Sequence, residues 1–460
     1  MPEVRNGIRG RGDAGAGRDD DAGSVLTATV LGGGLAGCEA AWALAERGIR
    51  VTLVEMRPAQ RTPAHRTDLL AELVCSNSFK SVETSNAHGL LKAELRLLGS
   101  LLLGCADEAR VPGGAALAVD RDLFARRATE LVAAHPLVTL VREEALDLPS
   151  PGVVATGPLT SDRLAEAIAR RLGTGSLAFY DAIAPIVSDE SLDHARLFAA
   201  SRRGKGDGAD YLNAPLSGAE YGAFVAALAS ADRYEAHGFD AVPYFEGCLP
   251  VEEMAARGPE TLRFGPMKPV GLVDPATGRM PFAVVQLRRE DRAGQMWNLV
   301  GFQTRLRTGE QQRVFRTIPG LAGAEFLRHG SIHRNSYLNT PACLSPHLAL
   351  KDAPTTLFAG QLTGIEGYTE SLGTGLLAGL NLARLLRGLE PLLPPPETML
   401  GALMVYLRDA DRANFQPMNA NFGLLPPLAD APRDKAKKKA LLAERALAAM
   451  GPFAGRIRAG

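Results

Sequence analysis

Two cysteines lie in sequence settings that favour a reactive thiol over a packed one. Cys75 follows an apolar run and lies among small polar residues in Cys-Ser-Asn-Ser, with Lys80 close behind it. Cys248 shortly precedes a proline that suits the first position of a helix, so this thiol would lie just outside the helix N-terminus. The helix dipole there favours the nucleophilic thiolate, although neighbouring glutamates oppose it. Packing as a small apolar side chain is the alternative for each thiol.

A glycine-rich segment near the N-terminus has the spacing of a dinucleotide-binding turn. Residues 32–37 read Gly-Gly-Gly-Leu-Ala-Gly, and Glu55 follows at the end of the next apolar run. Gly32 allows a tight turn, Gly34 lets the backbone approach a pyrophosphate, and Gly37 lets the following helix pack against the strand. Glu55 is placed to accept a hydrogen bond from a ribose hydroxyl. The predicted cofactor contacts in this unit are Gly32, Gly33, Gly34, Leu35, Ala36, Gly37 and Glu55.

The elements around this turn must hold it against the cofactor. An apolar, β-branched run at 25–31, a small-residue helix at 38–47 and a second apolar strand at 49–54 form a strand-turn-helix-strand unit. Further strands that end in small residues occur at 153–158 and 356–361, where small side chains leave room for a nucleotide. A glycine-rich strand end followed by a helix aims backbone amides at a cofactor. We therefore add Gly360, Gln361 and Gly373 to the predicted contacts.

Nucleotide-binding patterns near both ends of the chain, with a different pattern between them, predict an α/β fold with an insertion. Between residues 181 and 329 the alternation of strands and glycine turns gives way to helical stretches and a basic loop at 202–206. A cofactor that is contacted by segments near both ends of the chain must be long. This favours a bound flavin over a diffusing nicotinamide. The broad apolar face of 89–103 predicts a single helix there. The predicted organisation is a disordered leader at 1–23, a Rossmann-like FAD-binding domain at 24–184 and 330–460, and an inserted α+β domain at 185–329.

Composition and charge exclude several classes of protein. The chain has 46% apolar and 22% charged residues, as in ordinary globular proteins, and 51 basic residues balance 51 acidic ones. Net charge therefore gives no sign of a nucleic-acid partner, and any RNA contact must come from a local patch. The five cysteines are scattered without a Cys-X-X-Cys pair, which argues against zinc and disulfides and favours a cytoplasmic protein. We expect no signal peptide and no membrane-spanning stretch.

Several long motifs are similar to those of one family. They include Gly-Gly-Gly-Leu-Ala-Gly-Cys-Glu-Ala-Ala at 32–41, Glu-Met-Arg-Pro at 55–58, Leu-Val-Cys-Ser-Asn-Ser at 73–78, Phe-Glu-Gly-Cys-Leu-Pro at 245–250 and Ala-Gly-Gln-Leu-Thr-Gly-Ile-Glu-Gly-Tyr-Thr-Glu at 359–370. With these motifs the chain resembles the folate- and FAD-dependent tRNA (uracil-5-)-methyltransferases, TrmFO, which are related to the larger GidA flavoproteins. The resemblance implies a glutathione-reductase-like FAD-binding fold. One departure is Ala214, where the family commonly has another cysteine.

The resemblance also implies a reaction in which the two thiols have separate roles. A uridine in the T-loop of tRNA becomes ribothymidine, with the carbon from 5,10-methylenetetrahydrofolate and the hydride from FAD that NAD(P)H has reduced. By this resemblance Cys248 is the thiol that attacks C6 of uracil, which makes C5 nucleophilic. Cys75 matches the cysteine that lies against the flavin ring and helps to activate the carbon donor. The residues alone do not decide which thiol attacks, and the helix-end position favours Cys248.

Other interpretations of the same residues predict different substrates. The same chemistry on ribosomal RNA is one alternative, and a flavoprotein oxidoreductase without an RNA substrate is another. A GidA-like enzyme acting on the wobble uridine would need a longer helical domain than the residues after Arg387 provide. A non-catalytic FAD-bound RNA-binding protein would not need both thiols. Candidate phosphate anchors on tRNA are the 202–206 loop, Arg334 and the lysines within 435–439, for which a solvated surface is the alternative.

Overall fold

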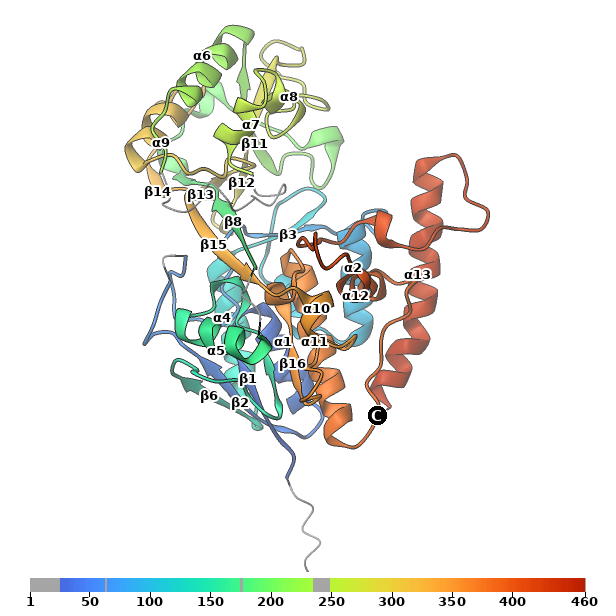
Figure 1. Cartoon of the computed structure of the whole chain (residues 1–460). Coiled ribbons are helices and arrows are strands. Elements are labelled where there is room, and N and C mark those ends of the chain that lie inside the picture. Colours follow the sequence, from blue (N-terminus) through green and yellow to red (C-terminus); the bar gives the residue numbers. More distant parts are fainter. Residues whose placement is uncertain (1–24, 63, 174–176, 235–248, 460) are drawn as a thin grey trace, which may run out of the picture.

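The chain forms two bodies, a lower one around a parallel sheet and an upper one around an antiparallel sheet (Figure 1). Two strands, β8 (Leu177–Ile183) and β15 (Ser331–Tyr337), pair in antiparallel fashion and run between the bodies. The predicted leader at 1–23 lies outside the described residues. The computed structural model describes residues 25–62, 64–173, 177–234 and 249–459, without the side chains of 177–183 and 332–335.

A five-stranded parallel sheet forms the centre of the lower body. Its strands, in spatial order, are β16 (Thr356–Phe358), β7 (Gly152–Val154), β1 (Thr27–Leu31), β2 (Arg50–Glu55) and β6 (Val138–Arg142). Val30 of β1 lies opposite Leu53 on one side and Val153 on the other. All three side chains are buried, as is typical of parallel sheets that helices cover on both faces. The predicted α/β fold is confirmed, and the late strand β16 pairs with β7 although the whole insertion separates them in sequence.

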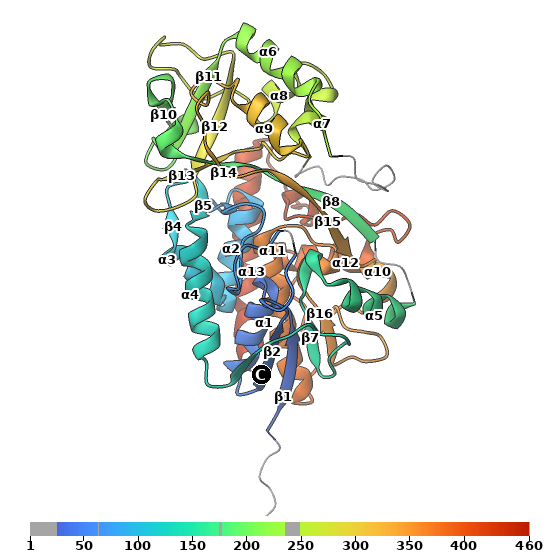
Figure 2. The ribbon, with the colours of Figure 1, turned by 90° about the vertical axis from the view of Figure 1, so that its left-hand side faces the viewer.

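Glycines let the two central helices of the lower body touch along their backbones. These helices are α1 (Leu35–Ala45) and α11 (Tyr368–Leu386), and they lie in the middle of the lower body (Figure 2). A Cβ at Gly375 would lie 2.2 Å from the Ala36 carbonyl oxygen, and one at Gly379 would lie 2.6 Å from a carbonyl oxygen of the next turn of α1. No side chain fits at either position, so the small-residue sequence of α11 is a packing requirement.

The single helix predicted at 89–103 is wrong, because the chain forms α2 (Ala87–Leu98) and α3 (Leu101–Glu108) instead. Gly99 adopts a left-handed conformation with φ of 86°, which ends α2. The buried carboxylate of Glu39 then accepts hydrogen bonds from the first amides of α3. The apolar positions continue across the break, which is why the pattern alone indicated one helix.

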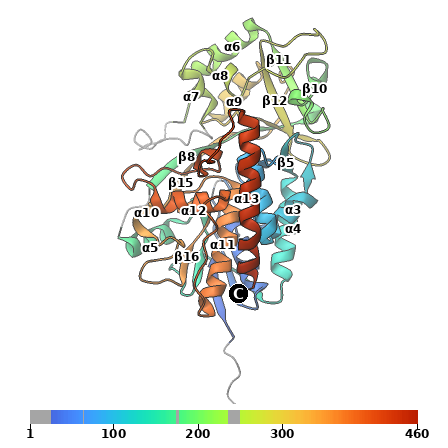
Figure 3. The same ribbon diagram turned by 90° about the vertical axis from the view of Figure 1, so that its right-hand side faces the viewer.

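The remaining helices of the lower body cover its outside. Helix α13 (Lys435–Arg458) runs along the surface and packs against α2 (Figure 3). Helix α12 (Met399–Asp409) begins where the buried carboxyl group of Glu94 accepts hydrogen bonds from its first two amides, at 2.7 and 2.9 Å. In the part of the chain that the structure describes, no helix is long and apolar enough to cross a membrane. The other elements are β3 (Ser78–Ser81), β4 (Arg110–Val111), β5 (Ala116–Val119), α4 (Arg121–Ala134), α5 (Asp162–Leu172) and α10 (Thr340–Cys343).

The upper body is an antiparallel sheet covered by short helices. Three phenylalanines from separate segments, Phe224, Phe302 and Phe315, pack together with ring centroids 5.9 and 5.8 Å apart. The strands, in spatial order, are β10 (Phe198–Ala199), β11 (Tyr211–Leu216), β12 (Ala283–Arg289), β13 (Met296–Leu299), β9 (Ile186–Ser188) and β14 (Phe326–Arg328). The helices are α6 (Gly218–Ala229), α7 (Val251–Ala256), α8 (Thr261–Phe264) and α9 (Thr308–Phe315).

Each body has its own main hydrophobic core. The buried residues of the upper core come from 187–324, whereas those of the lower core come from 28–168 and 337–457. A separate core is what an inserted domain needs to fold around. This separation supports our proposed division into an FAD-binding domain at 24–184 and 330–460 and an insertion at 185–329.

Candidate active site

A cleft opens at the carboxyl ends of β1, β2 and β7, which is where ligands bind in doubly wound sheets. Its walls come from the glycine turn after β1, the end of β2, the segment after β7 and the start of α11. The cleft therefore draws on both halves of the lower body, before and after the insertion. Seven of the ten predicted cofactor contacts line it, namely Gly32, Gly34, Leu35, Ala36, Glu55, Gly360 and Gln361.

The other three predicted contacts do not line the cleft but pack behind its walls. They are Gly33, Gly37 and Gly373. The Gly33 amide donates a hydrogen bond to the Glu55 carboxylate at 2.7 Å. A Cβ at Gly37 would lie 1.8 Å from the Gly32 carbonyl oxygen, so only glycine lets α1 begin this close to the strand end. Gly373 is buried in α11, where a Cβ would lie 3.0 Å from a leucine of α12. These glycines pack the structure beside the cleft.

Gly34 is the glycine that leaves space for a ligand. Its φ of −78° is open to any residue, and a Cβ built there would touch nothing within 4 Å. The space that it leaves belongs to the cleft, next to the first turn of α1. Unpaired amides at a helix N-terminus attract a pyrophosphate, and the missing side chain lets the backbone approach it. The cleft therefore fits an adenine dinucleotide such as FAD.

Glu55 ends β2 as a buried, ionised carboxylate. Its Oε2 accepts from the Gly33 amide at 2.7 Å, and its Oε1 accepts from the amide and the Nε of Arg57 at 3.0 and 2.7 Å. Burial raises its pKa, but the hydrogen bonds and the charge of Arg57 outweigh burial and hold the pKa below its ordinary value. Because each carboxylate oxygen can accept more than one hydrogen bond, Glu55 can still receive a ribose hydroxyl.

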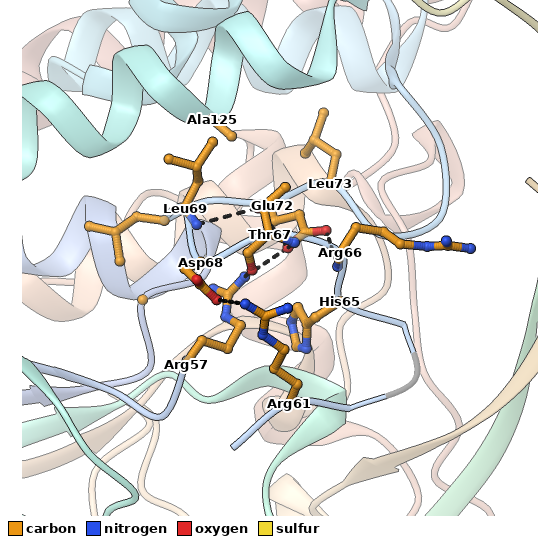
Figure 4. A network of polar contacts seen from close by, with 12 residues as sticks. Arg57, Arg61, His65, Arg66, Thr67, Asp68, Leu69, Glu72, Leu73 and Ala125 are labelled. Atoms are coloured by element: carbon orange, nitrogen blue, oxygen red, sulfur yellow. Dashed lines mark hydrogen bonds and ion pairs between the residues drawn. The ribbon is translucent and has the colours of Figure 1, made fainter. Parts of the chain in front are cut away.

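Glu72 is a second acidic residue at the cleft, and the sequence pattern did not single it out. Its Oε2 accepts from Arg57 Nη1 at 2.8 Å, and its Oε1 accepts from the Arg66 amide at 2.7 Å (Figure 4). These contacts fold the segment 57–74 back on itself and make it one wall of the cleft. His65 of this segment also lines the cleft, where burial and the charge of Arg57 lower its pKa, so the imidazole is neutral at pH 7.

Cys75 lies where the cleft ends, beside the first residue of α11. The hydroxyl oxygen of Tyr368 accepts hydrogen bonds from the amides of Cys75 and Ser76, at 2.9 and 3.0 Å. Tyr368 and Val74 line the cleft, and Cys75 is half-buried next to them. The structure thus brings one of the two predicted thiols to the predicted cofactor site.

The second predicted thiol, Cys248, lies outside the described residues. Helix α7 begins at Val251, with Pro250 as its N-cap and not its first helical residue. Two other thiols have packing roles, because Cys38 and Cys105 are buried and burial raises the pKa of both. The geometry of the site therefore rests on Cys75.

Comparison with known proteins identifies the family. The family described as glucose inhibited division protein A matches residues 27–390. The methylenetetrahydrofolate--tRNA-(uracil-5-)-methyltransferase TrmFO of Geobacter sulfurreducens is 59% identical over 422 residues, which cover 91% of this chain and 97% of the relative. The protein of the same name from Moorella thermoacetica is 55% identical over 93% of this chain and 98% of its own length. This chain belongs to the TrmFO family of GidA-related proteins.

Solved structures show that this chain shares its fold with GidA. Two crystal forms of Aquifex aeolicus GidA superpose on it with TM-scores of 0.68 and 0.67, at 16% and 15% sequence identity. The alignments cover 94% of this chain and 73% and 76% of the GidA chains. The similarity includes both bodies, because so large a share of the chain cannot lie within one of them.

The basic residues predicted to contact RNA differ in whether their side chains are bonded to other residues of the protein. Arg202 donates to a glutamine of β12 at 2.7 Å, and Lys205 pairs with a glutamate of the lower body at 2.6 Å. Arg203 between them is exposed, as are the lysines within 435–439 at the start of α13. The side chain of Arg334 in β15 lies outside the described residues. Lys205 is exposed as well but is held in that ion pair, so Arg203 and the lysines within 435–439 are the exposed candidates that remain.

Proposed function

We propose that this chain transfers a methyl group to C5 of a uridine in tRNA, with 5,10-methylenetetrahydrofolate as carbon donor and FAD as cofactor. Relatives that are 59% and 55% identical over more than nine-tenths of the chain carry this activity in their names. The observation that carries the proposal is the course of the cleft, which starts at a dinucleotide turn and ends beside Cys75. The proposed target is the T-loop uridine, and the proposed reductant is NAD(P)H.

The residues that line the cleft would hold the cofactor along its length. The first turn of α1 and Gly34 would bind the pyrophosphate, and Glu55 would bind the adenosine ribose. The backbone at Gly360 and Gln361, together with the start of α11, would enclose the flavin end. Reduced FAD bound there supplies the hydride that completes the methyl group. Tyr368 would meanwhile keep the Cys75 backbone fixed against that end of the cleft.

The two thiols would divide the chemistry on the base. We assign to Cys248 the addition of its thiolate at C6 of uracil, which makes C5 nucleophilic toward the methylene carbon of the donor. Loss of the C5 proton and departure of the folate amine would then leave an exocyclic methylene on the base. After the methylene is reduced, the C6–S bond breaks and releases the methylated uracil and the thiolate. Cys75 would support the flavin site and help to activate the donor.

Recognition of tRNA must bring one base into the cleft. Extracting the target uridine from the T-loop stack costs on the order of a few kcal/mol, which contacts to the backbone of the RNA must offset. Arg203 and the lysines within 435–439 are the proposed phosphate contacts, because their side chains are exposed. Contacts of this kind make RNA affinity fall as salt concentration rises.

The proposed function is tested by following the donor carbon. The purified, flavin-containing protein is incubated with NADPH, methylenetetrahydrofolate labelled in its methylene carbon, and unmodified tRNA or ribosomal RNA. Label is expected in the methyl group on C5 of a T-loop uracil of the tRNA, and none is expected without the folate. Label that enters only ribosomal RNA, or a methyl group that comes only from S-adenosylmethionine, would contradict the proposal.

The assignment of the thiols has a separate test. A tRNA that carries 5-fluorouridine should trap the covalent adduct, because fluorine at C5 cannot leave as the proton does. The Cys248→Ala variant is expected to form no adduct, whereas Cys105→Ala, a matched change at a buried thiol, is expected to form it normally. An adduct that forms in Cys248→Ala but not in Cys75→Ala would show that Cys75, and not Cys248, is the thiol that attacks C6.

A further inference from the structure

Side chains from four distant parts of the chain hold the segment that carries Cys75. Arg121 Nη1 and Arg328 Nη2 donate to the carbonyl oxygens of the two residues before it, at 2.9 and 2.8 Å. Tyr368 accepts the Cys75 amide, and Arg288 donates to the hydroxyl of the next residue at 3.1 Å. Arg288 and Arg328 belong to the upper body, so contacts between the two bodies fix the position of this thiol.

The arginines around the segment are not equally neutralised. Arg121 forms an ion pair with Glu290, with Nε and Oε2 2.7 Å apart. Arg328 has no carboxylate at ion-pair distance among the described residues, and its buried Nε has no hydrogen-bond partner there. Burial and the charges of Arg121 and Arg66 lower the pKa of Arg328 to about 10, whereas a Cys75 thiolate favours its charged form.

The described charged groups at this place are of both signs. Asp120 and Asp122 line the small hollow beside Arg328, and Tyr368 is a further titratable group near the thiol. Among the described residues that line this hollow or donate to the segment through their side chains, four are arginines and three are carboxylates. The groups counted are Arg66, Arg121, Arg288, Arg328, Glu290, Asp120 and Asp122.

We propose that Arg328 is a positioning residue that keeps the Cys75 thiol ionised. Its guanidinium holds the carbonyl that directly precedes Cys75, no carboxylate of the described residues lies at ion-pair distance from it, and a nearby cation favours a thiolate. Because Arg328 ends strand β14 of the upper body, the seating of that body on the lower one sets the charge of the thiol. The inference rests on the proposed function only for what the thiolate does, and it is tested without RNA or folate.

The test is the rate at which iodoacetamide alkylates Cys75 in the flavin-containing enzyme between pH 5 and 10, read on the Cys75 peptide by mass spectrometry. Arg328→Met removes the charge at similar length and is expected to slow alkylation at pH 7 by about tenfold, the effect of one unit in the ionisation equilibrium. Arg328→Lys keeps the charge and is expected to slow it less. Glu290→Gln leaves Arg121 without its carboxylate and is expected to speed alkylation.

Opposite signs in the two variants separate a charge effect from general loosening of the structure. Arg316→Met is the matched control, because its guanidinium donates to the Ala324 carbonyl at 2.9 Å and not to the Cys75 segment, and it is expected to react like the wild type. An unchanged rate at pH 7 in Arg328→Met, or a wild-type Cys75 that does not react at any pH, would overturn the proposal. If Arg328→Met loses its flavin, a Glu290→Gln rate no faster than the wild type overturns it.

Discussion

The two ends of the cleft are built in different ways. At the dinucleotide end the backbone itself forms the site, through glycines at 32–37 and a carboxylate at the next strand end. At the Cys75 end, side chains form it, and they reach in from segments as distant as Tyr368, which is 293 residues away in sequence. A site made by the backbone is set by a short stretch of sequence. A site made by side chains depends on how both bodies pack.

Substitutions at the two ends of the cleft should also have different effects. Where the backbone is crowded, an added side chain has no room, and the site is lost in one step. Where several side chains share one segment, removing one contact leaves the others in place, and the loss is graded. The predictions below use this contrast, first at the cleft and then at two buried titratable groups elsewhere in the lower body.

The largest effects are expected from two glycines at the dinucleotide end. Gly37→Val would place a side chain 1.8 Å from the Gly32 carbonyl oxygen and push α1 away from the sheet, so we expect no bound flavin and a loss above about 3 kcal/mol in the free energy of unfolding. Gly34→Val would fill only the cleft, so we expect the flavin to be lost while the apoprotein keeps its stability. Flavin absorbance and urea unfolding of the apoprotein measure the two effects.

The matched control is Gly451→Ala in α13, where a Cβ would meet nothing within 4 Å and lies far from the cleft. This variant should keep its flavin and gain on the order of half a kcal/mol from reduced freedom of the unfolded chain. A Gly34→Val protein that purifies with a full complement of flavin would show that the space beside α1 does not hold the pyrophosphate.

A graded effect is expected from Tyr368→Phe at the other end of the cleft. The change leaves the amides of Cys75 and Ser76 without their acceptor, at a cost of about 1–3 kcal/mol. We expect faster hydrogen exchange in residues 73–77, a lower melting temperature and retained flavin. Tyr406→Phe is the control, because that hydroxyl donates to a carbonyl at an exposed site. Unchanged exchange at Cys75 in Tyr368→Phe would show that the arginines alone hold the segment.

The same contrast explains how much of the molecule could be predicted from its sequence. The turn, helix α1 and Glu55 were predictable because strand, glycines and acid lie within one short unit. The arginines and the hydroxyl around Cys75 were not, because no periodicity relates Arg328 to Val74, 254 residues apart. The break at Gly99 was missed for a different reason, since the apolar pattern runs through it without interruption.

The same kind of contact occurs away from the cleft, at Glu94. Its side chain accepts a hydrogen bond from the backbone of α12, 305 residues away in sequence. Burial raises its pKa to about 8, although the two amides of α12 act in the opposite direction. Between about pH 5 and pH 8 the folded protein therefore keeps a proton that the unfolded chain has released, and the free energy of unfolding falls as the pH rises. Glu94→Gln should remove this fall, measured by urea unfolding at both ends of the window. The exposed Glu444→Gln should keep it, and equal slopes in all three proteins would contradict the assignment.

Lys92 has an effect of the opposite sign. Its ammonium is fully buried and donates to the Phe79 carbonyl at 2.6 Å, four residues from Cys75 along the chain. Burial lowers its pKa from 10.5 to about 7, although Glu370 favours the charged form. Between those values the unfolded chain binds a proton that the folded protein lacks, so Lys92 makes the free energy of unfolding rise with pH.

The Lys92→Met variant should lack this rise. Its free energy of unfolding should therefore fall relative to that of the wild type as the pH goes from 7 to 9.5. Denaturant midpoints at the two values measure the effect, with the exposed Lys437→Met as the matched control. Glu94 lowers the free energy of unfolding as the pH rises, and Lys92 raises it. The two variants should therefore move the pH of greatest stability in opposite directions, and shifts in the same direction would show that one assignment is wrong. Removing the glutamate should shift that maximum upward, and removing the lysine should shift it downward.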